Sequence, residues 1–408
     1  MAKPTIRFKG YTDDWEQRKL GDLVDRVTRK NQDLVSELPL TISAQYGLID
    51  QNEFFDKRVA SKDVSGYYLI ENGEFAYNKS TSTDAPWGAI KRLDRYKNGV
   101  LSTLYIVFGI KENNPIDSDF LVSYYSTNLW HKGIHEIAAE GARNHGLLNI
   151  APADFFETKL MIPQDIEEQK KIGKYFEELE RLITLHQRKC EETKILKKYM
   201  LQKMFPQNGQ KVPEIRFKGF TDDWEQRKLP EFVSFFNGLT YTPDDVEETG
   251  TLVLRSSNVK NGEIVDADNV YVNDKAVTSE NVHEGDIIVV VRNGSRALIG
   301  KHAQIKASMP NTVIGAFMSG MRSEHSSFVN ALLDTSAFEN EIAKNMGATI
   351  NQITGYMFSK MEFMIPSGDE QQKIGEHFQS LDNLITLHQR KCEELQNIKK
   401  FMLQNMFV

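Results

Sequence analysis

An eleven-residue sequence that occurs twice constrains this chain more than any other feature. LITLHQRKCEE runs from Leu182 to Glu192 and returns letter for letter from Leu384 to Glu394, 202 residues later. Each copy lies within a longer stretch of helical character, roughly residues 166–205 and 369–407, and these stretches end in MLQKMF and MLQNMF. An internal repeat of this kind indicates a chain built from two copies of one structural unit.

Apolar residues within the two stretches recur at alternating steps of four and three. This spacing places them along one side of a helix, as in a coiled coil. A helix of about 38 residues is roughly 57 Å long at ~1.5 Å per residue, and it could not bury such a side alone. We therefore expect the two helices to pack on each other. The residues predicted at this helix–helix seam are Ile172, Phe176, Leu179 and Ile183 in the first copy and Ile374, Phe378, Leu381 and Ile385 in the second.

Length and composition are those of an ordinary globular protein. The 408 residues have room for two or three domains, with 40% hydrophobic and 26% charged content. The first residues, MAKPTIRFKGYTDDW, lack the apolar core of a signal peptide, and no run of about 18 apolar residues occurs. We therefore predict a cytoplasmic protein. The net charge of −7 disfavours unassisted nucleic-acid binding and predicts a partner that shares the electrostatic work.

The sequence shows no convincing catalytic or metal-binding motif. The two cysteines, Cys190 and Cys392, occupy equivalent positions on the seam and are predicted to pack as small apolar groups. Cys and His do not cluster at zinc-site spacings, so we predict no metal site. The nearest approach to a phosphate-binding loop, Gly294 to His302, has five residues between its glycines and His where Ser or Thr should bind magnesium. The sequence therefore predicts a non-catalytic chain.

A second repeat opens each half of the chain. Residues 4–24 and 213–233 are identical at 16 of 21 positions, and we call them the leading repeats. The chain thus reads twice as leading repeat, domain and long helix, with a polar linker between the halves. The predicted boundaries are 1–163 for the first domain, 164–206 for the first long helix, 207–212 for the linker, 213–366 for the second domain and 367–408 for the second long helix.

The two domains between the repeats barely resemble each other, yet a common pattern remains. An apolar, strand-like run ends in a polar loop at Gly73–Ser80 in the first domain and at Gly285–Ser295 in the second. Helical pieces follow in both, so we predict an α+β fold with two mixed domains in a pseudo-twofold tandem repeat. Near-identical repeats indicate a docking surface used twice, whereas divergent domains indicate two different targets.

Polar loops at matched places of the two domains are the remaining candidates for chemistry. In the major groove of DNA, Arg and Lys can bind guanine through paired hydrogen bonds, and Asn and Gln can bind adenine. Ser and Thr more often contact phosphates. One such loop is more often simply solvated, but recurrence in two divergent domains favours DNA contact. The candidate DNA-binding residues are Asn78, Lys79, Ser80, Thr81, Arg143, Asn144 and His145 in the first domain and Arg255, Asn258, Arg292, Asn293, Ser295, Arg296, Thr349, Asn351 and Gln352 in the second.

The repeated segments of this chain resemble those of the specificity subunits of type I restriction–modification systems. The residues concerned are the junctions MIPQDIEEQKKIG and MIPSGDEQQKIG, the DDWEQRKL words of the leading repeats and the two LITLHQRKCEE helices. The resemblance covers the whole chain and looks most like the staphylococcal type. It implies two target-recognition domains separated by an antiparallel coiled coil. Each domain would read one half of an asymmetric, bipartite DNA site.

The same resemblance implies partners for the chain. Two methyltransferase subunits would dock near the repeated helices and leading repeats, and restriction–translocation subunits would join them. S-adenosylmethionine, ATP and Mg²⁺ would then bind to those partners. Base-reading residues in the family vary with the target, so none of the candidates above is carried over from it.

Two alternatives remain open. One is a coiled-coil adaptor that joins partner proteins without contacting DNA. It would explain the repeats and the acidic balance, but not the matched polar loops. The other is an enzyme whose site is assembled from residues that no motif reveals.

Overall fold

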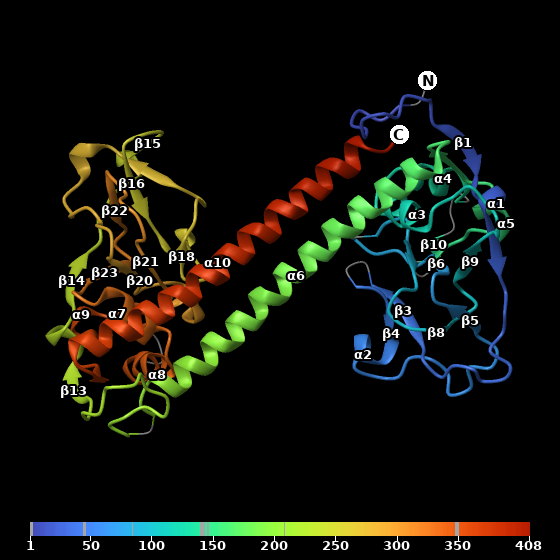
Figure 1. The fold of residues 1–408 in the computed structure, drawn as a ribbon. Helices are drawn as coiled ribbons and strands as arrows, with labels where there is room; N and C mark the ends of the chain where they lie inside the picture. Colours follow the sequence, from blue (N-terminus) through green and yellow to red (C-terminus); the bar gives the residue numbers. More distant parts are fainter. Residues whose placement is uncertain are drawn as a thin grey trace. The chain divides into compact units, whose positions relative to one another are not determined.

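The computed structural model describes residues 3–43, 46–83, 85–138, 143–144 (backbone only), 147–207, 209–346 and 351–408. The chain forms two compact units. Unit 1 contains residues 1–186 and 391–408, and unit 2 contains residues 187–390. Each unit therefore combines one mixed domain with parts of both long helices (Figure 1).

Unit 1 is built around a four-stranded antiparallel sheet in the order β2–β9–β6–β7. Its strands are Val24–Val27, Ile106–Ile110, Phe75–Asn78 and Ala89–Arg92. The remaining strands form the pairs β1 (Glu16–Lys19) with β12 (Lys159–Ile162), β3 (Leu40–Ser43) with β4 (Gly47–Asp50), β5 (Tyr68–Glu71) with β8 (Asn98–Leu101), and β10 (Arg143–Asn144) with β11 (Leu147–Leu148). The short helices are α1 (Leu20–Leu23), α2 (Gln51–Phe55), α3 (Ser118–Tyr125), α4 (Trp130–Ile137) and α5 (Pro152–Phe156).

Unit 2 is built around a sheet of the same kind, in the order β14–β23–β20–β21. Its strands are Ser234–Asn237, Met318–Arg322, Ile287–Val290 and His302–Gln304. A second sheet joins β15 (Val246–Glu247), β19 (Val270–Val272), β16 (Thr251–Leu254) and β22 (Thr312–Ile314), and two pairs join β13 (Glu225–Lys228) with β24 (Glu362–Ile365) and β17 (Val259–Lys260) with β18 (Glu263–Ile264). The helices are α7 (Ser326–Leu333), α8 (Ser336–Asn345) and α9 (Gly355–Phe358), with 3₁₀ turns at Leu229–Glu231, Pro243–Asp245, Ser256–Asn258, Asp274–Ala276 and Arg296–Leu298.

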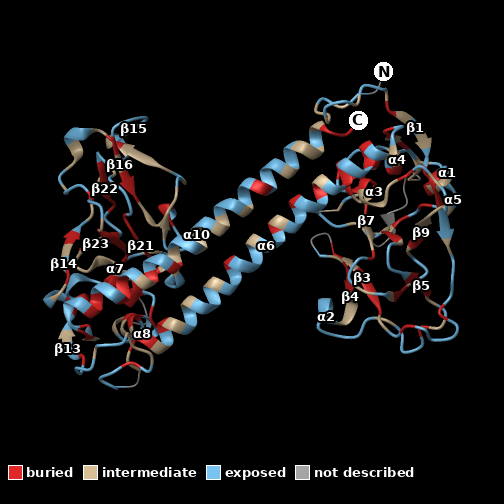
Figure 2. Ribbon diagram, in the orientation of Figure 1, coloured by how far each residue is buried: buried red, intermediate tan, exposed pale blue. Residues whose placement is uncertain are grey.

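The two central sheets share strand order and direction although their sequences have diverged. In both, an inner apolar strand, β6 or β20, is buried and then leaves the sheet as a polar loop. Buried residues concentrate in these strands, whereas the long helices are mostly exposed and bury residues mainly where they pack on the mixed domains (Figure 2). The units differ outside this sheet, because unit 2 has a second four-stranded sheet, whereas the strands between the matched elements of unit 1 form the separate pairs β3–β4 and β5–β8.

The two long helices are α6 (Ile166–Met204) and α10 (Gly368–Asn405), and they run antiparallel in each unit. In unit 1, the Phe176 ring lies 5.8 Å from the Phe407 ring. In unit 2, the rings of Phe205 and Phe378 are 5.9 Å apart. Seven of the eight residues predicted at the seam are buried, and Ile385 is half-buried. None of the described helices is long and apolar enough to cross a membrane.

One glycine in each long helix lets the mixed domain approach closely. A Cβ atom at Gly173 would lie 2.7 Å from the backbone at Asp119 and Phe120, where α3 begins. A Cβ atom at Gly375 would lie 2.8 Å from the backbone nitrogen of Phe328 in α7. Only glycine permits backbones to approach this closely. These positions therefore fix α3 and α7 against their long helices.

The first leading repeat joins the start of α6 to the end of α10. The Arg7 guanidinium donates two hydrogen bonds, of 2.6 and 2.8 Å, to the buried carboxylate of Glu168. The amide of Ile6 donates to the carbonyl oxygen of Asn405 at 2.9 Å. The side chain of Trp15, in the same repeat, is buried in the core of unit 1. A two-point pair between Arg and a carboxylate fixes orientation as well as distance.

The second leading repeat makes the same contacts in unit 2. Arg216 donates to the buried Glu370 at 2.7 and 2.8 Å, near the start of α10. The amide of Ile215 donates to the carbonyl of Lys203, near the end of α6, at 2.8 Å. Trp224 is buried in the same way as its counterpart. In both units, therefore, the leading repeat packs against the start of one long helix and the end of the other.

Candidate nucleic-acid interface

The polar loop after β6 lies beside the second polar segment of unit 1. Ser80 forms a β-bridge with Leu147, and the amide of Leu148 donates to the carbonyl oxygen of Lys79 at 3.0 Å. The side chains of Arg143 and Asn144, and all of His145, lie outside the described residues, although the backbone at 143–144 pairs with β11. We call residues 78–81, the backbone of residues 143–144 and residues 147–148 interface 1.

Interface 1 is held in place by its own short contacts. The side-chain oxygen of Asn78 accepts a hydrogen bond of 3.0 Å from the amide of Ser80 and so fixes the turn that leaves the strand. The ammonium group of Lys79 donates to the carbonyl of Ile150 at 3.5 Å. Desolvation lowers the pKa of Lys79. Ser80 remains exposed, and Thr81 follows it in the same loop.

The matched loop after β20 makes the equivalent contact in unit 2. Arg292 forms a β-bridge with Gln352, and the amide of Asn293 donates to the carbonyl of Asn351 at 3.4 Å. The side-chain amide of Asn351 donates in turn to the carbonyl of Gly294 at 3.1 Å. Thr349 lies outside the described residues. Two candidate segments separated by more than fifty residues are thus adjacent in the fold.

A third segment of unit 2 also reaches this place, through a residue that the sequence analysis missed. The Asn293 side chain donates to the Ser256 hydroxyl at 3.1 Å, and Lys301 donates to the Ser256 carbonyl at 3.3 Å. A single serine in a polar turn gives no distinctive sequence signal. We call Ser256, residues 292–296 and residues 351–352 interface 2.

The candidates Arg255 and Asn258 are occupied by contacts inside their own turn. Arg255 forms an ion pair of 2.7 Å with Asp268. Asn258 is fully buried; its oxygen accepts from the Arg255 amide at 2.9 Å, and its nitrogen donates to Ala267 and Asn269 at 2.8 and 2.9 Å. A buried amide with these partners shapes the turn, so we leave Asn258 and Arg255 out of interface 2.

The remaining candidates of interface 2 lie at the surface. Arg292, Ser295 and Arg296 are exposed, and the amide of Ser295 donates to the side-chain oxygen of Asn293 at 2.9 Å. The Arg292 guanidinium lies 5.0 Å from the centre of the Phe317 ring, which is itself exposed. An arginine held over an aromatic ring keeps its donors available at low conformational cost.

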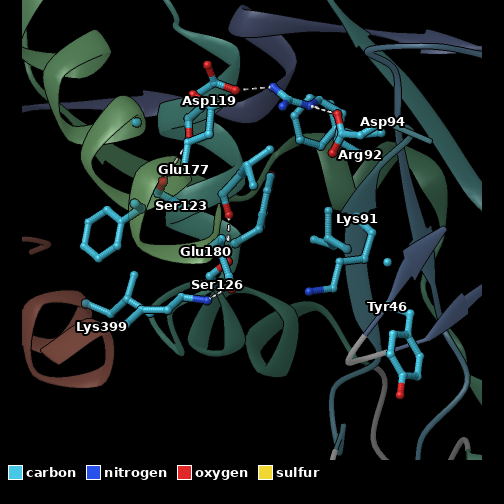
Figure 3. Close-up of a pocket in the computed structure, with 18 of the residues that line it drawn as sticks. Tyr46, Lys91, Arg92, Asp94, Asp119, Ser123, Ser126, Glu177, Glu180 and Lys399 are labelled. Carbon is cyan, nitrogen blue, oxygen red and sulfur yellow. Dashed lines mark hydrogen bonds and ion pairs between the residues drawn. The ribbon is translucent and has the colours of Figure 1, made fainter. Parts of the chain in front are cut away.

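A cavity of about 490 Å³ in unit 1 lies between the central sheet, α3 and the long helices. Lys91 of β7 and Lys399 of α10 point toward each other across it (Figure 3). Desolvation and the charge of Lys399 lower the pKa of Lys91. Lys399 forms an ion pair with Glu180, whereas the ammonium group of Lys91 makes no hydrogen bond or ion pair with any residue the structure describes. Three basic and four acidic residues line the cavity, namely Lys91, Arg92, Lys399, Asp94, Asp119, Glu177 and Glu180, so it shows no bias toward a polyanion.

The matching place in unit 2 contains a network of charged side chains. Lys197 forms ion pairs of 2.6 Å with Asp334 and 2.5 Å with Asp382, and His302 approaches Asp334 at 3.4 Å. Desolvation alone would raise the pKa of Asp334, but its interactions with His302 and Lys197 lower it to about 2. Within the described ranges, no group of three or more His, Cys, Asp or Glu residues could hold a metal ion.

Comparison with known proteins distinguishes between the functional hypotheses that the sequence left open. The model of the type I restriction modification DNA specificity domain matches residues 12–194 and again residues 221–397. The chain belongs to this family. It carries two DNA specificity domains in tandem, so the predicted family is confirmed and the adaptor alternative is not favoured. The assigned role is recognition rather than catalysis.

Proteins similar to this chain include specificity subunits of type I restriction enzymes. That of the type I restriction enzyme MjaVIII from Methanocaldococcus jannaschii is 23% identical over 406 residues, covering 95% of this chain and 91% of the relative. That of StySPI from Salmonella potsdam is 24% identical over 188 residues, covering 44% of this chain and 40% of the relative.

A solved structure has the same fold. The S subunit of a type I restriction–modification system from M. genitalium aligns with a TM-score of 0.67 at 14% identity, covering 100% of this chain and 99% of that one. The tandem fold of mixed domains and long helices is thereby confirmed. The staphylococcal likeness and the candidate DNA-binding residues stay predictions.

Proposed function

We propose that interface 1 and interface 2 each read one half of an asymmetric, two-part DNA site. One observation carries this proposal. In two domains of divergent sequence, the same backbone bridge, Ser80 with Leu147 and Arg292 with Gln352, brings the same two polar segments together. A fold that preserves the meeting of two loops while changing their side chains suits a surface that reads different targets.

The side chains at the bridge support two different half-sites. Arg292 is exposed and can donate two hydrogen bonds to guanine, and the amides of Asn351 and Gln352 can pair with adenine. At the place of Arg292, interface 1 has Ser80, which more often contacts phosphate. The two units therefore present different hydrogen-bonding patterns, and the half-sites should differ.

We further propose that two copies of a methyltransferase subunit dock on the long helices. Leu196 and Tyr199 of α6 are exposed, as are their repeat counterparts Ile398 and Phe401 of α10. Exposed apolar groups that recur in this way are typical of protein interaction sites. The acidic net charge of −7 also favours partners that supply phosphate contacts. S-adenosylmethionine, ATP and Mg²⁺ would belong to the methyltransferase and restriction subunits.

Methylation mapping tests the DNA proposal. The chain is co-expressed with its cognate methyltransferase, and methylated adenines are mapped across a genome. We expect a two-part motif that depends on this chain, and methylation without the chain would contradict the proposal. Exchanging residues 73–149 for the equivalent segment of another family member should change one half of the motif only.

Single substitutions test interface 2 more finely. Arg292→Ala should relax or abolish recognition of one half-site, at about 1–3 kcal/mol for a paired contact. The control is Lys275→Ala, because Lys275 is an exposed cation of unit 2 that lies outside interface 2 and outside the repeats, and its loss should leave the motif unchanged. An unchanged motif in the Arg292 variant would remove this arginine from the interface.

Native mass spectrometry tests the docking proposal. Tyr199→Asp and Phe401→Asp should each reduce the bound methyltransferase from two copies to one, and the double variant should bind none. Ile195→Asn is the matched control, because Ile195 is also exposed but its repeat counterpart is Asn397. Retention of two copies by the double variant would contradict this surface.

A further inference from the structure

Each mixed domain exposes one large apolar side chain at the same position of its fold. Leu104 in unit 1 and Phe317 in unit 2 are each 55% exposed. Each is the third residue of a matched turn, in which the Tyr105 amide donates to Ser102 at 3.0 Å and the Met318 amide donates to Gly315 at 2.8 Å. Both turns lead directly into the central sheet, so these side chains have a firm backbone support.

The sheet register places both residues beside the proposed DNA interfaces. The pairings of Tyr77 with Ile106 and of Val289 with Ser319 are equivalent. Leu104 precedes Ile106 by two residues, as Phe317 precedes Ser319, so both residues lie close to the end of the inner strand from which the polar loop leaves. In unit 2 the amides of Val291 and Arg292 donate to the Phe317 carbonyl at 3.0 and 3.2 Å.

A single exposed apolar residue is ordinary in any protein. Here the exposure recurs at one position in two domains whose sequences otherwise differ, and it recurs beside the polar segments that those domains have in common. A Leu or Phe left in water forgoes the favourable free energy that burial of its side chain would contribute. In unit 2 the neighbour is a cation, since the Arg292 guanidinium lies 5.0 Å from the centre of the Phe317 ring. An apolar side chain beside a cation is complementary to a nucleic acid, because the apolar group can contact the stacked bases and the cation can contact the phosphates.

We propose that Leu104 and Phe317 are wedges that enter the base stack of duplex DNA, one in each half-site. This inference rests on the proposed function. Leu and Phe are side chains that DNA-bending proteins insert between base steps, which partly unstacks the step and kinks the duplex. Unstacking is easiest at flexible pyrimidine–purine steps, so each wedge favours such a step without any hydrogen bond to it. The wedges thus add sequence preference at a position that the polar loops do not read.

Fluorescence of 2-aminopurine tests the wedges in the complex of the full chain with its methyltransferase. Duplexes carry the probe at successive positions of the mapped site, because the probe brightens when it unstacks. The methyltransferase carries a substitution that abolishes extrusion of the target adenine, so this brightening is excluded. We expect one bright step in each half-site, away from the methylated adenine. Absence of a bright step in either half, with the site still bound specifically, overturns the wedge and leaves the proposed function standing.

Matched variants assign each bright step to its side chain. Phe317→Ala should remove brightening from the half-site of unit 2 alone and weaken binding about 5- to 50-fold, and Leu104→Ala should do so in the other half. Phe317→Leu should restore most of the signal, because leucine occupies the matched place in unit 1. Tyr356→Ala is the control, since Tyr356 is a still more exposed aromatic residue of unit 2. Brightening that survives Phe317→Ala, or that is lost equally in the Tyr356 variant, contradicts the proposal.

Discussion

The two units attach their mixed domains to the long helices in different ways. In unit 1 the joint contains a cavity of about 490 Å³, in which Lys91 faces Lys399. In unit 2, Lys197 connects Asp334, at the end of α7, to Asp382 of α10. The same helical repeats therefore support one joint with a cavity and another with a continuous charge network.

The difference shows that the residues contributed by the long helices are alike in the two units, whereas those contributed by the mixed domains differ. On the helices, Lys399 and Glu180 are the repeat counterparts of Lys197 and Asp382, and both pairs form ion pairs. On the domain side, the residue that follows α7 is Asp334, whereas Ser126 follows α3 at the matching place. A domain can therefore change its share of the joint while the helices keep theirs.

The aromatic residues at the helix ends should show what the two units share. Phe205→Ala should destabilise unit 2, and Phe407→Ala should destabilise unit 1, by about 3–5 kcal/mol each, because both rings are buried in the core. Hydrogen exchange resolved by peptide reports each unit separately. Phe401→Ala, at an exposed position of α10, is the control and should cost less than about 0.5 kcal/mol. Clearly unequal costs for the two buried rings would break the comparison.

The repeat-equivalent lysines should separate the two joints. Lys197→Met should cost unit 2 about 2 kcal/mol, because Asp334 and Asp382 then face each other without a cation. Lys399→Met should cost unit 1 less than about 1 kcal/mol, because its partner Glu180 is exposed and screened by water. The same exchange experiment measures both variants. Equal losses would show that the network adds nothing to the joint of unit 2.

A carboxylate introduced at the matching place should make the first joint more like the second. Ser126→Asp places an acid on the lining of the cavity that contains Lys91 and Lys399. We expect unit 1 to gain about 0.5 kcal/mol, because a partly exposed ion pair contributes little. A double-mutant cycle with Lys399→Met isolates the interaction. A coupling energy of zero would place the new carboxylate away from the lysine.

The pH dependence of unit 2 should carry the smallest effect. Burial lowers the pKa of His302, but the hydrogen bond and charge of Asp334 outweigh burial and raise it overall. A raised pKa in the folded state stabilises the fold below about pH 6.5, and this contribution disappears as the pH rises through the folded-state value. Asp334, with its pKa lowered to about 2, stays charged throughout this range. His302→Gln should therefore cost a few tenths of a kcal/mol more at pH 5.5 than at pH 9 in thermal unfolding. A larger cost at pH 9 would reverse the assignment.

The sequence predicted the repeated frame because periodic patterns carry it. The stretches 166–205 and 369–407 became helices at Ile166–Met204 and Gly368–Asn405, since their four- and three-residue steps allow one buried side. The sequence showed that two polar loops occur in the same order in each domain, but not that they lie side by side. The β-bridges at Ser80 and Arg292 show that the two loops are adjacent in the fold.

Other parts of the site could not be predicted, for identifiable reasons. The burial of Asn258 depends on acceptors seven to eleven residues away in an irregular turn. Leu104 and Phe317 are single exposed apolar residues in turns. A single residue cannot form a periodic pattern, so the sequence gives no signal for them. The network around Lys197 joins Asp334 and His302 from separate segments that meet only in the folded unit, so no local pattern predicts it.

The composition of unit 1 bears on the order in which the protein matures on the ribosome. Unit 2 is continuous in sequence from residue 187 to residue 390, whereas unit 1 also requires residues 391–408. Synthesis proceeds from the N-terminus, so every residue of unit 2 exists before unit 1 is complete. Leu395, Met406 and Phe407 then fill the core that contains Trp15. The domain that is translated first is therefore the last to finish folding, and until then its open core is a target for chaperones and proteases.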